Sequence, residues 1–179
     1  MQPVYSFPPI EPTHCRLLIL GSMPGKASLA AQQYYAHPRN AFWPIMAELL
    51  GFDAEADYPQ RTQALQQAGI GLWDVMQSCI RPSSLDSDIE ETSILPNDFP
   101  AWFRRHPHTQ AIFCNGGKAF QSYRRHVLPL LDEHFQQLPL HQLPSTSPAH
   151  ASRTLQQKQL EWYKVMTSLL NQNQGTEHD

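Results

Sequence analysis

The sequence predicts an α/β fold, a three-layer sandwich in which a central, mainly parallel sheet of four strands is flanked by helices. Three observations predict it. Short apolar runs alternate with helical patterns along the chain, a glycine or a proline follows several of these elements, and no segment is repeated. Strands that alternate with helices form a parallel sheet covered on both faces. The 179 residues suit a single domain, with its core over about residues 14–171 and a polar tail at 172–179.

Several apolar segments have the pattern of strands. The run Leu17–Leu20 is apolar throughout and stops at Gly21, as a strand buried in a parallel sheet does. Residues 77–107 give mixed signals, and we assign no element to them. The other predicted strands are residues 69–75, 110–114 and 137–143.

Helical periodicity marks the segments between and after these strands. In residues 41–50 the apolar side chains lie on one helical face, and Gly51 is placed to end the helix. Pro59 suits the first turn of the next helix, where its missing N–H is not needed. The predicted helices are residues 41–50, 59–68, 118–127 and 152–170.

Charge and hydropathy exclude several classes of protein. The formal net charge is −3 with histidines neutral, so binding to nucleic acid would have to rest on a local site rather than on the field of the whole molecule. No apolar run is long enough to span a membrane. Residues 1–13 contain no Lys or Arg, which argues against a secretory signal.

The cysteines and histidines do not form a metal-binding pattern. Cys15, Cys79 and Cys114 lie far apart, which argues against a zinc ribbon, an iron–sulfur cluster or a disulfide framework. Reduced thiols favour a cytoplasmic protein. His106 and His108 have no second pair of ligands nearby, so we expect them to be solvated loop residues. We therefore expect no metal or cofactor.

Polar segments follow the predicted strands. In parallel sheets, ligands bind beyond the carboxyl ends of the strands. Those ends carry Gly21–Gly25, Asp74, Asn115–Lys118 and Pro144–Pro148, which should therefore converge on one rim.

The loop at Gly21–Lys26 only superficially resembles a phosphate-binding loop. Three residues separate its glycines where the nucleotide-binding pattern needs four, and Ala27 stands where that pattern needs Ser or Thr. No dinucleotide-binding glycine pattern follows any strand either. A simple tight turn at the end of the strand is the alternative interpretation of this segment.

Residues 33–43 combine aromatic rings with a His, an Arg and an Asn. Aromatic faces stack on nucleobases, and Asn and Arg hydrogen-bond base edges or phosphates. We expect Phe42 and Trp43 to belong to the core. Asn40 has an alternative role as the cap of the helix that starts at Ala41, and that role is compatible with a place in a binding site.

Five motifs in a fixed order resemble the uracil-DNA glycosylase superfamily over about residues 16–170. The motifs are Gly21–Gly25, Tyr35–Trp43, Gly71–Asp74, Phe113–Phe120 and Leu143–His150. The resemblance implies a DNA glycosylase of base-excision repair that flips out a deaminated base and hydrolyses its N-glycosidic bond.

At two positions the sequence departs from the motifs of better-known branches of the superfamily, and these departures indicate which branch it resembles. Met23 stands where the mismatch-specific enzymes have a catalytic Asn, and Leu143 where the classical uracil enzymes have a His. The chain is therefore most similar to the hypoxanthine-DNA (deoxyinosine) glycosylase branch, which relies on the Asn matched here by Asn40. A mismatch-specific uracil or thymine enzyme and a catalytically weak DNA-binding relative are the alternatives.

The resemblance also implies roles for individual residues. Asn40 would orient the attacking water, and Asp74 would accept from base N–H groups or stabilise the sugar cation; capping a following helix is the alternative for Asp74. Tyr35 rather than Tyr34 would stack on the extruded base. The remaining predicted substrate-binding residues are Gly21, Ser22, Met23 and Asn115.

As a glycosylase of this kind, the protein is expected to be a monomer whose partner is double- or single-stranded DNA with a deaminated base, held by a further group of residues. His150 ends the segment that matches the family's wedge, which enters the gap left by the flipped base. Arg153 is a weaker candidate, because an ordinary surface charge is its simpler interpretation. The predicted DNA-binding residues are Lys118, Ser145, Ser147, Pro148 and His150.

Overall fold

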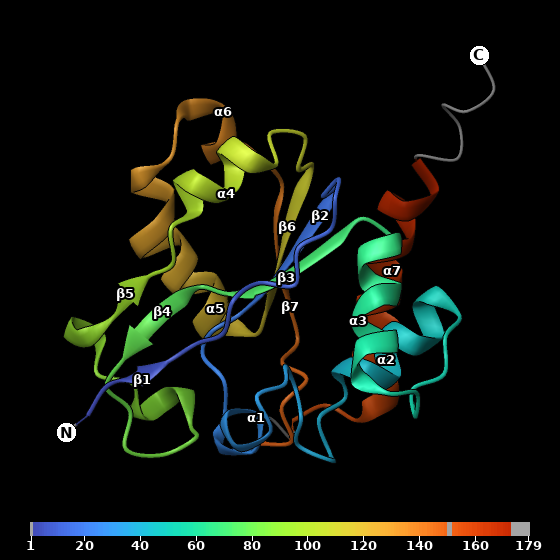
Figure 1. Cartoon of the computed structure of the whole chain (residues 1–179), viewed down its shortest axis with the longest axis horizontal. Helices are drawn as coiled ribbons and strands as arrows, with labels where there is room; N and C mark the ends of the chain where they lie inside the picture. Colours follow the sequence, from blue (N-terminus) through green and yellow to red (C-terminus); the bar gives the residue numbers. More distant parts are fainter. Residues whose placement is uncertain (1, 150–151, 173–179) are drawn as a thin grey trace.

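The main sheet contains four parallel strands in the order β3-β2-β6-β7 (Figure 1). The computed structural model describes residues 2–149 and 152–172. Because β2 lies between two neighbours and under helices on both faces, all of its residues are buried, which explains its apolar sequence. The strands are β2 (Leu17–Gly21), β3 (Ile70–Asp74), β6 (Ala111–Asn115) and β7 (Leu140–Leu143), so the predicted fold class is confirmed.

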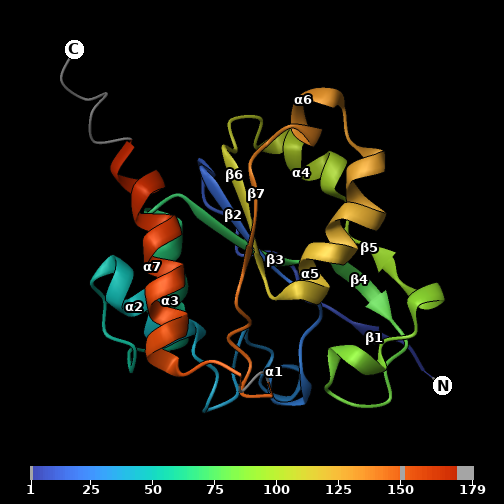
Figure 2. The ribbon, with the colours of Figure 1, turned by 180° about the vertical axis from the view of Figure 1, so that it is seen from behind.

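Helices cover both faces of this sheet (Figures 1 and 2). One face carries α2 (Phe42–Leu50), α3 (Tyr58–Gln67) and α7 (Leu155–Gln172). The other carries α4 (Phe99–Arg105), α5 (Gly117–Ser122) and α6 (Glu133–Gln136). The result is the three-layer arrangement that the sequence predicted.

Alternate residues of β2 build the two cores. Leu17 and Ile19 pack in the cluster that contains Trp162, whereas Leu18 and Leu20 pack in a second cluster on the opposite face. This alternation follows from the strand geometry, in which successive side chains point to opposite faces. Both cores hold the strand ends rigidly, and with them the loops that follow.

The predicted helices begin and end close to the expected residues. Gly51 adopts a left-handed conformation with φ of 77° and ends α2, as its position predicts. Pro59 lies in the first turn of α3. After α5 the chain continues as a π-helical turn at Tyr123–Val127 and a 3-10 turn at Leu128–Leu130, so the predicted helix at 118–127 is irregular in its second half.

Residues 77–107, left without a prediction, contain most of a second, antiparallel sheet. Its strand order is β1-β4-β5, and its first strand lies near the N-terminus. Two 3-10 turns, η1 and η2, and helix α4 complete this segment, and α1 (Lys26–Ala31) is a further short helix that the sequence did not predict. The strands are β1 (Val4–Tyr5), β4 (Met76–Cys79) and β5 (Leu95–Pro96), and the turns are η1 (Asp86–Asp88) and η2 (Glu91–Ser93).

The expectation that His106 is solvated is wrong. Its ring is buried against Trp102, and its Nε2 lies 2.6 Å from Oε1 of Glu11. This ion-pair geometry ties α4 to the N-terminal segment, a contact between residues 95 positions apart in sequence. Within the described residues, no helix is long and apolar enough to cross a membrane.

Candidate active site

A cleft of about 770 Å³ opens at the carboxyl ends of the main-sheet strands. Its walls come from the loop after β2, the segment before α2, the turn around η1, and the loop after β7. Predicted site residue His150 lies outside the described residues. All the others line the cleft: Gly21, Ser22, Met23, Tyr35, Asn40, Asp74, Asn115, Lys118, Ser145, Ser147 and Pro148.

Gly21 allows two polar side chains to meet at the floor of the cleft. It ends β2 and pairs in register with Asp74 at the end of β3. A Cβ atom on Gly21 would lie 2.5 Å from Oδ1 of Asp74 and 2.8 Å from the hydroxyl oxygen of Tyr35. Only glycine leaves that space free, so the floor depends on this position.

The Asp74 carboxyl is buried at the floor of the cleft. Its Oδ2 has no hydrogen-bond partner among the described residues. Burial and, to a smaller extent, the charge of Asp86 raise the pKa of this carboxyl to about 7, and Arg81 opposes the shift. Since β4 begins at Met76 and no helix follows, the interpretation of Asp74 as a helix cap is wrong.

Tyr34 and Tyr35 have different surroundings. The ring of Tyr34 is buried in the core, and its hydroxyl donates to the carbonyl oxygen of Pro8 at 2.9 Å. Tyr35 has a left-handed backbone with φ of 55°, and its ring lies against Phe42 with 4.3 Å between centroids. The buried hydroxyl of Tyr35 has no hydrogen-bond partner in the described part of the chain. Tyr35 thus has an unused polar group at the cleft, and stacking on a base stays a prediction.

Asn40 is held at the start of α2. Its Oδ1 accepts from the backbone N–H of Phe42 at 3.0 Å, and its own N–H donates to the carbonyl of His37. The N-cap residue of α2 is Ala41 rather than Asn40, and Asn40 satisfies the first N–H of the helix from the position before the cap. No described residue accepts a hydrogen bond from the side-chain nitrogen of Asn40, so this bond leaves part of the amide available.

Asn115 fixes the loop on the opposite wall. Its Nδ2 donates to Oγ1 of Thr146, and its Oδ1 accepts from the backbone N–H of Thr146, both at 2.9 Å. The carbonyl of Thr146 in turn accepts from the N–H of Ala41. Because the amide of Asn115 is paired on both sides, the geometry gives this residue a positioning role in the loop. Direct contact with substrate stays a prediction.

Comparison with known proteins identifies the protein family to which this chain belongs. The family model described as the uracil DNA glycosylase superfamily matches residues 8–171. The chain belongs to the uracil DNA glycosylase superfamily. This confirms the predicted family and, with it, the predicted class of enzyme, a DNA glycosylase.

Individual relatives agree with this assignment. Two proteins described as hypoxanthine DNA glycosylases, from Methanosarcina barkeri and Methanosarcina acetivorans, are each 36% identical over 114 residues, which is 63% of this chain and 71% of theirs. The solution NMR structure of a protein from Methanosarcina acetivorans, named as a candidate uracil DNA glycosylase, has a TM-score of 0.74 and 32% identity. That alignment covers 92% of this chain and 96% of the other.

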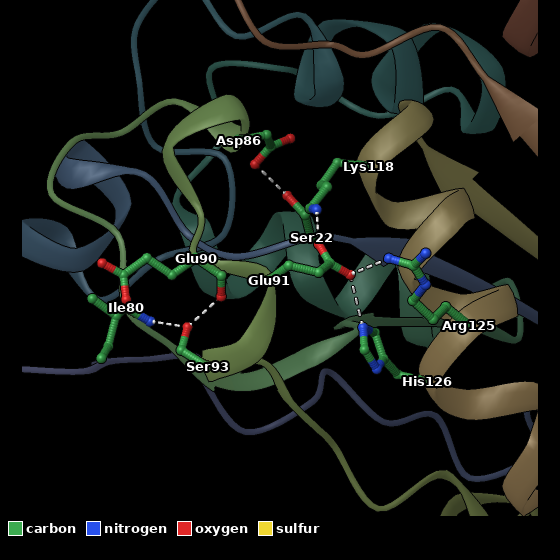
Figure 3. Close-up of polar contacts among 9 residues, drawn as sticks. All are labelled: Ser22, Ile80, Asp86, Glu90, Glu91, Ser93, Lys118, Arg125 and His126. Atoms are coloured by element: carbon green, nitrogen blue, oxygen red, sulfur yellow. Dashed lines mark hydrogen bonds and ion pairs between the residues drawn. The ribbon is translucent and has the colours of Figure 1, made fainter.

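Sequence reasoning missed two charged residues of the glycosylase, Asp86 and the buried Arg81. Asp86 lies on η1 and accepts a hydrogen bond from the hydroxyl of Ser22 at 2.7 Å, as Figure 3 shows. Burial raises the pKa of Asp86. Arg81 is 5% exposed and donates from Nη2 to the carbonyl of Pro24 at 2.6 Å. Both charges hold the loop after β2, and both come from the segment without a predicted element.

Met23 occupies a different environment from its neighbours in this loop. Its side chain packs with Met76, Cys79 and the residues around them in a third apolar cluster. Part of Met23 still lines the cleft. The side chain therefore anchors the loop of the glycosylase, and a contact with substrate stays a prediction.

Lys118, predicted to contact phosphate, is already paired. Its Nζ lies 2.6 Å from Oε2 of Glu91, whose other oxygen contacts Arg125 and His126 (Figure 3). The hydrogen bond from Lys118 is the largest of the effects that lower the pKa of Glu91 to about 2. These ion pairs connect η2 of the glycosylase to the segment that begins with α5. A DNA phosphate would therefore have to compete with Glu91 for Lys118.

Proposed function

We propose that this glycosylase removes hypoxanthine from DNA that contains deoxyinosine. The observation that carries the proposal is the pair of polar groups above Gly21: the carboxyl of Asp74 and the hydroxyl of Tyr35 are buried together without satisfying each other. Buried polar groups are normally hydrogen-bonded, so an unsatisfied pair in a cleft suits a ligand. The two relatives described as hypoxanthine DNA glycosylases support the same substrate.

This pair suits hypoxanthine better than adenine. Hypoxanthine carries a proton on N1 and a carbonyl at C6, so the Asp74 carboxylate can accept from N1–H and the Tyr35 hydroxyl can donate to O6. Adenine has a lone pair on N1, which would face the carboxylate oxygen and be repelled. Discrimination against the normal base would thus come from an unfavourable contact as well as from a favourable one.

In this proposal, Asn40 positions the water that attacks the sugar. Cleavage of the N-glycosidic bond passes through a transition state with a cationic sugar and a departing base. The bond from Phe42 fixes the Asn40 amide, and its Oδ1 has a second lone pair that can accept a proton of the water. Catalysis then rests on positioning and on electrostatic stabilisation, because an amide is not a strong base.

The target base must leave the duplex before it reaches the cleft. The loop after β7 is small and stiff where it faces the rim, with Ser145, Ser147 and Pro148, and it suits contacts to phosphates. We infer that the protein acts as a monomer in the cytoplasm. Uracil in a mismatch is the second candidate substrate, since its N3–H and carbonyl match the same pair of groups.

Incubation of labelled duplexes tests the proposal. Each duplex carries a single inosine, uracil or xanthine, or a mismatched thymine, and alkali then cleaves any abasic site. We expect the fastest cleavage at inosine and none at adenine. Binding to these duplexes without cleavage of any would favour the catalytically weak relative, and faster cleavage at uracil would favour the mismatch-specific enzyme.

A further inference from the structure

A smaller pocket of about 350 Å³ adjoins the active-site cleft. The two share Arg39, Asn40, Thr146 and Pro148 as a common wall. Arg39, Arg153 and Lys158 bring positive charge to the pocket, and no acidic side chain lines it. We call it the Lys158 pocket; its other lining residues are Pro38, Ala41, Pro44 and Leu155.

Lys158 is the unusual member of this group. It lies on α7 and is only 5% exposed, and its Nζ donates to the carbonyl of Ser147 at 3.2 Å. This is its one hydrogen bond within the described residues, which leaves two of three ammonium protons available. No described carboxylate pairs with it, and burial lowers its pKa. A buried cation without a counter-charge is unfavourable, and a bound anion would relieve it.

The other polar groups near the pocket that could bind an anion already have partners. Thr154 and Gln157 bond each other reciprocally and cap the start of α7. Arg153 forms an ion pair with Glu161, which agrees with its interpretation as an ordinary surface charge. Lys158 and the exposed Arg39, which has no ion pair among the described residues, remain as cations for a ligand.

We propose that the Lys158 pocket binds one phosphodiester of the lesion strand, next to the extruded nucleotide. The proposal rests on the proposed function, because the strand must enter the adjoining cleft. Asn40 and Thr146 line both cavities and lie between them. A DNA strand whose extruded base is in the cleft would therefore run along these two residues, with its backbone beside the Lys158 pocket. Lys158 also holds Ser147, so phosphate binding would be coupled to the position of the loop after β7.

Neutral linkages in the DNA provide the test. A duplex with a tetrahydrofuran abasic-site analogue is made in a series, each with one phosphate near the lesion replaced by an uncharged methylphosphonate. We expect one position at which the replacement weakens binding to the wild-type protein by about tenfold, as the loss of a charge-assisted hydrogen bond does. At that position Lys158→Met should show little further loss, since the two changes remove the same contact.

Two further variants make the test decisive. Arg39→Gln should show the same non-additive loss of binding. Because Arg39 is exposed, this variant should fold, and it tests the pocket if Lys158→Met fails to fold. Arg104→Gln on α4, at the opposite end of the sheet from the cleft (Figure 1), should bind like the wild type at every position. A plot of log K for DNA binding against the logarithm of the salt concentration has a negative slope. Its magnitude should decrease by about 0.9 for Lys158→Met and stay unchanged for Arg104→Gln.

Additive losses at every methylphosphonate position, for both Lys158→Met and Arg39→Gln, would overturn the proposal. The abasic duplex carries no base, so this result does not depend on which base is excised. A protein that excises no hypoxanthine yet shows the non-additive position would refute the proposed substrate and leave the pocket assignment standing.

Discussion

The two walls of the cleft differ in whether their polar groups are hydrogen-bonded within the protein. On the wall at the ends of β2 and β3, the Asp74 Oδ2 and the neighbouring Tyr35 hydroxyl have no hydrogen-bond partner among the described residues. On the wall from β6 and β7, Asn115 and Thr146 satisfy each other. Leaving buried polar groups unpaired destabilises a fold, so the first wall is suited to a ligand and the second to holding a loop in place.

Removing the amide of Asn40, which lines the cleft just before α2, should have the largest effect. We expect Asn40→Ala to lower the rate of base excision by about a hundredfold or more, because the water loses its positioning group. Lesion DNA should still bind nearly as well. Single-turnover excision and equilibrium binding measure the two effects separately. An unchanged rate would remove Asn40 from the mechanism, and a protein that unfolds would assign it to the helix cap alone.

Asp74 should make the stability of the first wall depend on pH. Its pKa in the folded protein is about 7, above the ordinary 3.8, so the folded state holds this proton more tightly than the unfolded state. Stability is therefore lost as pH rises from about 4 to about 7. We expect Asp74→Asn to avoid about 2–3 kcal/mol of the loss that the wild type shows between pH 5 and pH 8.

Urea unfolding at both pH values measures this difference. Asp86 has a raised pKa as well, but it is present in both proteins and its direct contribution cancels in the comparison. Excision of hypoxanthine by Asp74→Asn should fall even where the variant is the more stable protein. An identical dependence on pH in the two proteins would contradict the assignment of the raised pKa to Asp74.

Breaking the second wall should mainly affect stability and DNA binding. Asn115→Ala leaves the backbone N–H and the hydroxyl of Thr146 without partners, which should lower the free energy of unfolding by about 1–3 kcal/mol. Thermal unfolding should show a lower Tm, and binding of matched and lesion-bearing duplexes should weaken together. Loss of excision without any change in Tm would place Asn115 in contact with the substrate instead.

The smallest effect is expected from the two neighbouring tyrosines. Tyr35→Phe removes a hydroxyl that has no partner, so stability should change by less than about 0.5 kcal/mol while hypoxanthine excision falls. Tyr34→Phe is the matched control: it removes the bond to Pro8 and should lower stability by about 1 kcal/mol with little effect on excision. The reverse pattern would mean that Tyr34 faces the substrate.

Much of this architecture follows from local sequence. The apolar run at Leu17–Leu20 predicts a central buried strand, and the glycine after it predicts where the strand ends. Parallel strands place their carboxyl ends at the same edge, so the loops that carry Gly21, Asp74 and Asn115 had to converge. The resemblance of the motifs then predicted the family, which the comparisons confirm.

Tertiary structure alone decided how each polar group in the cleft is used. Ser22 meets Asp86 64 residues away, and Asn115 meets Thr146 31 residues away, and no local pattern specifies such pairs. The small sheet escaped prediction because its strands are two to four residues long and pair across distant parts of the chain. Whether Asp74, Arg81 and Lys158 are buried depends on what packs over them, so a charge that looks solvated in the sequence can be a buried, partly unpaired group in the fold.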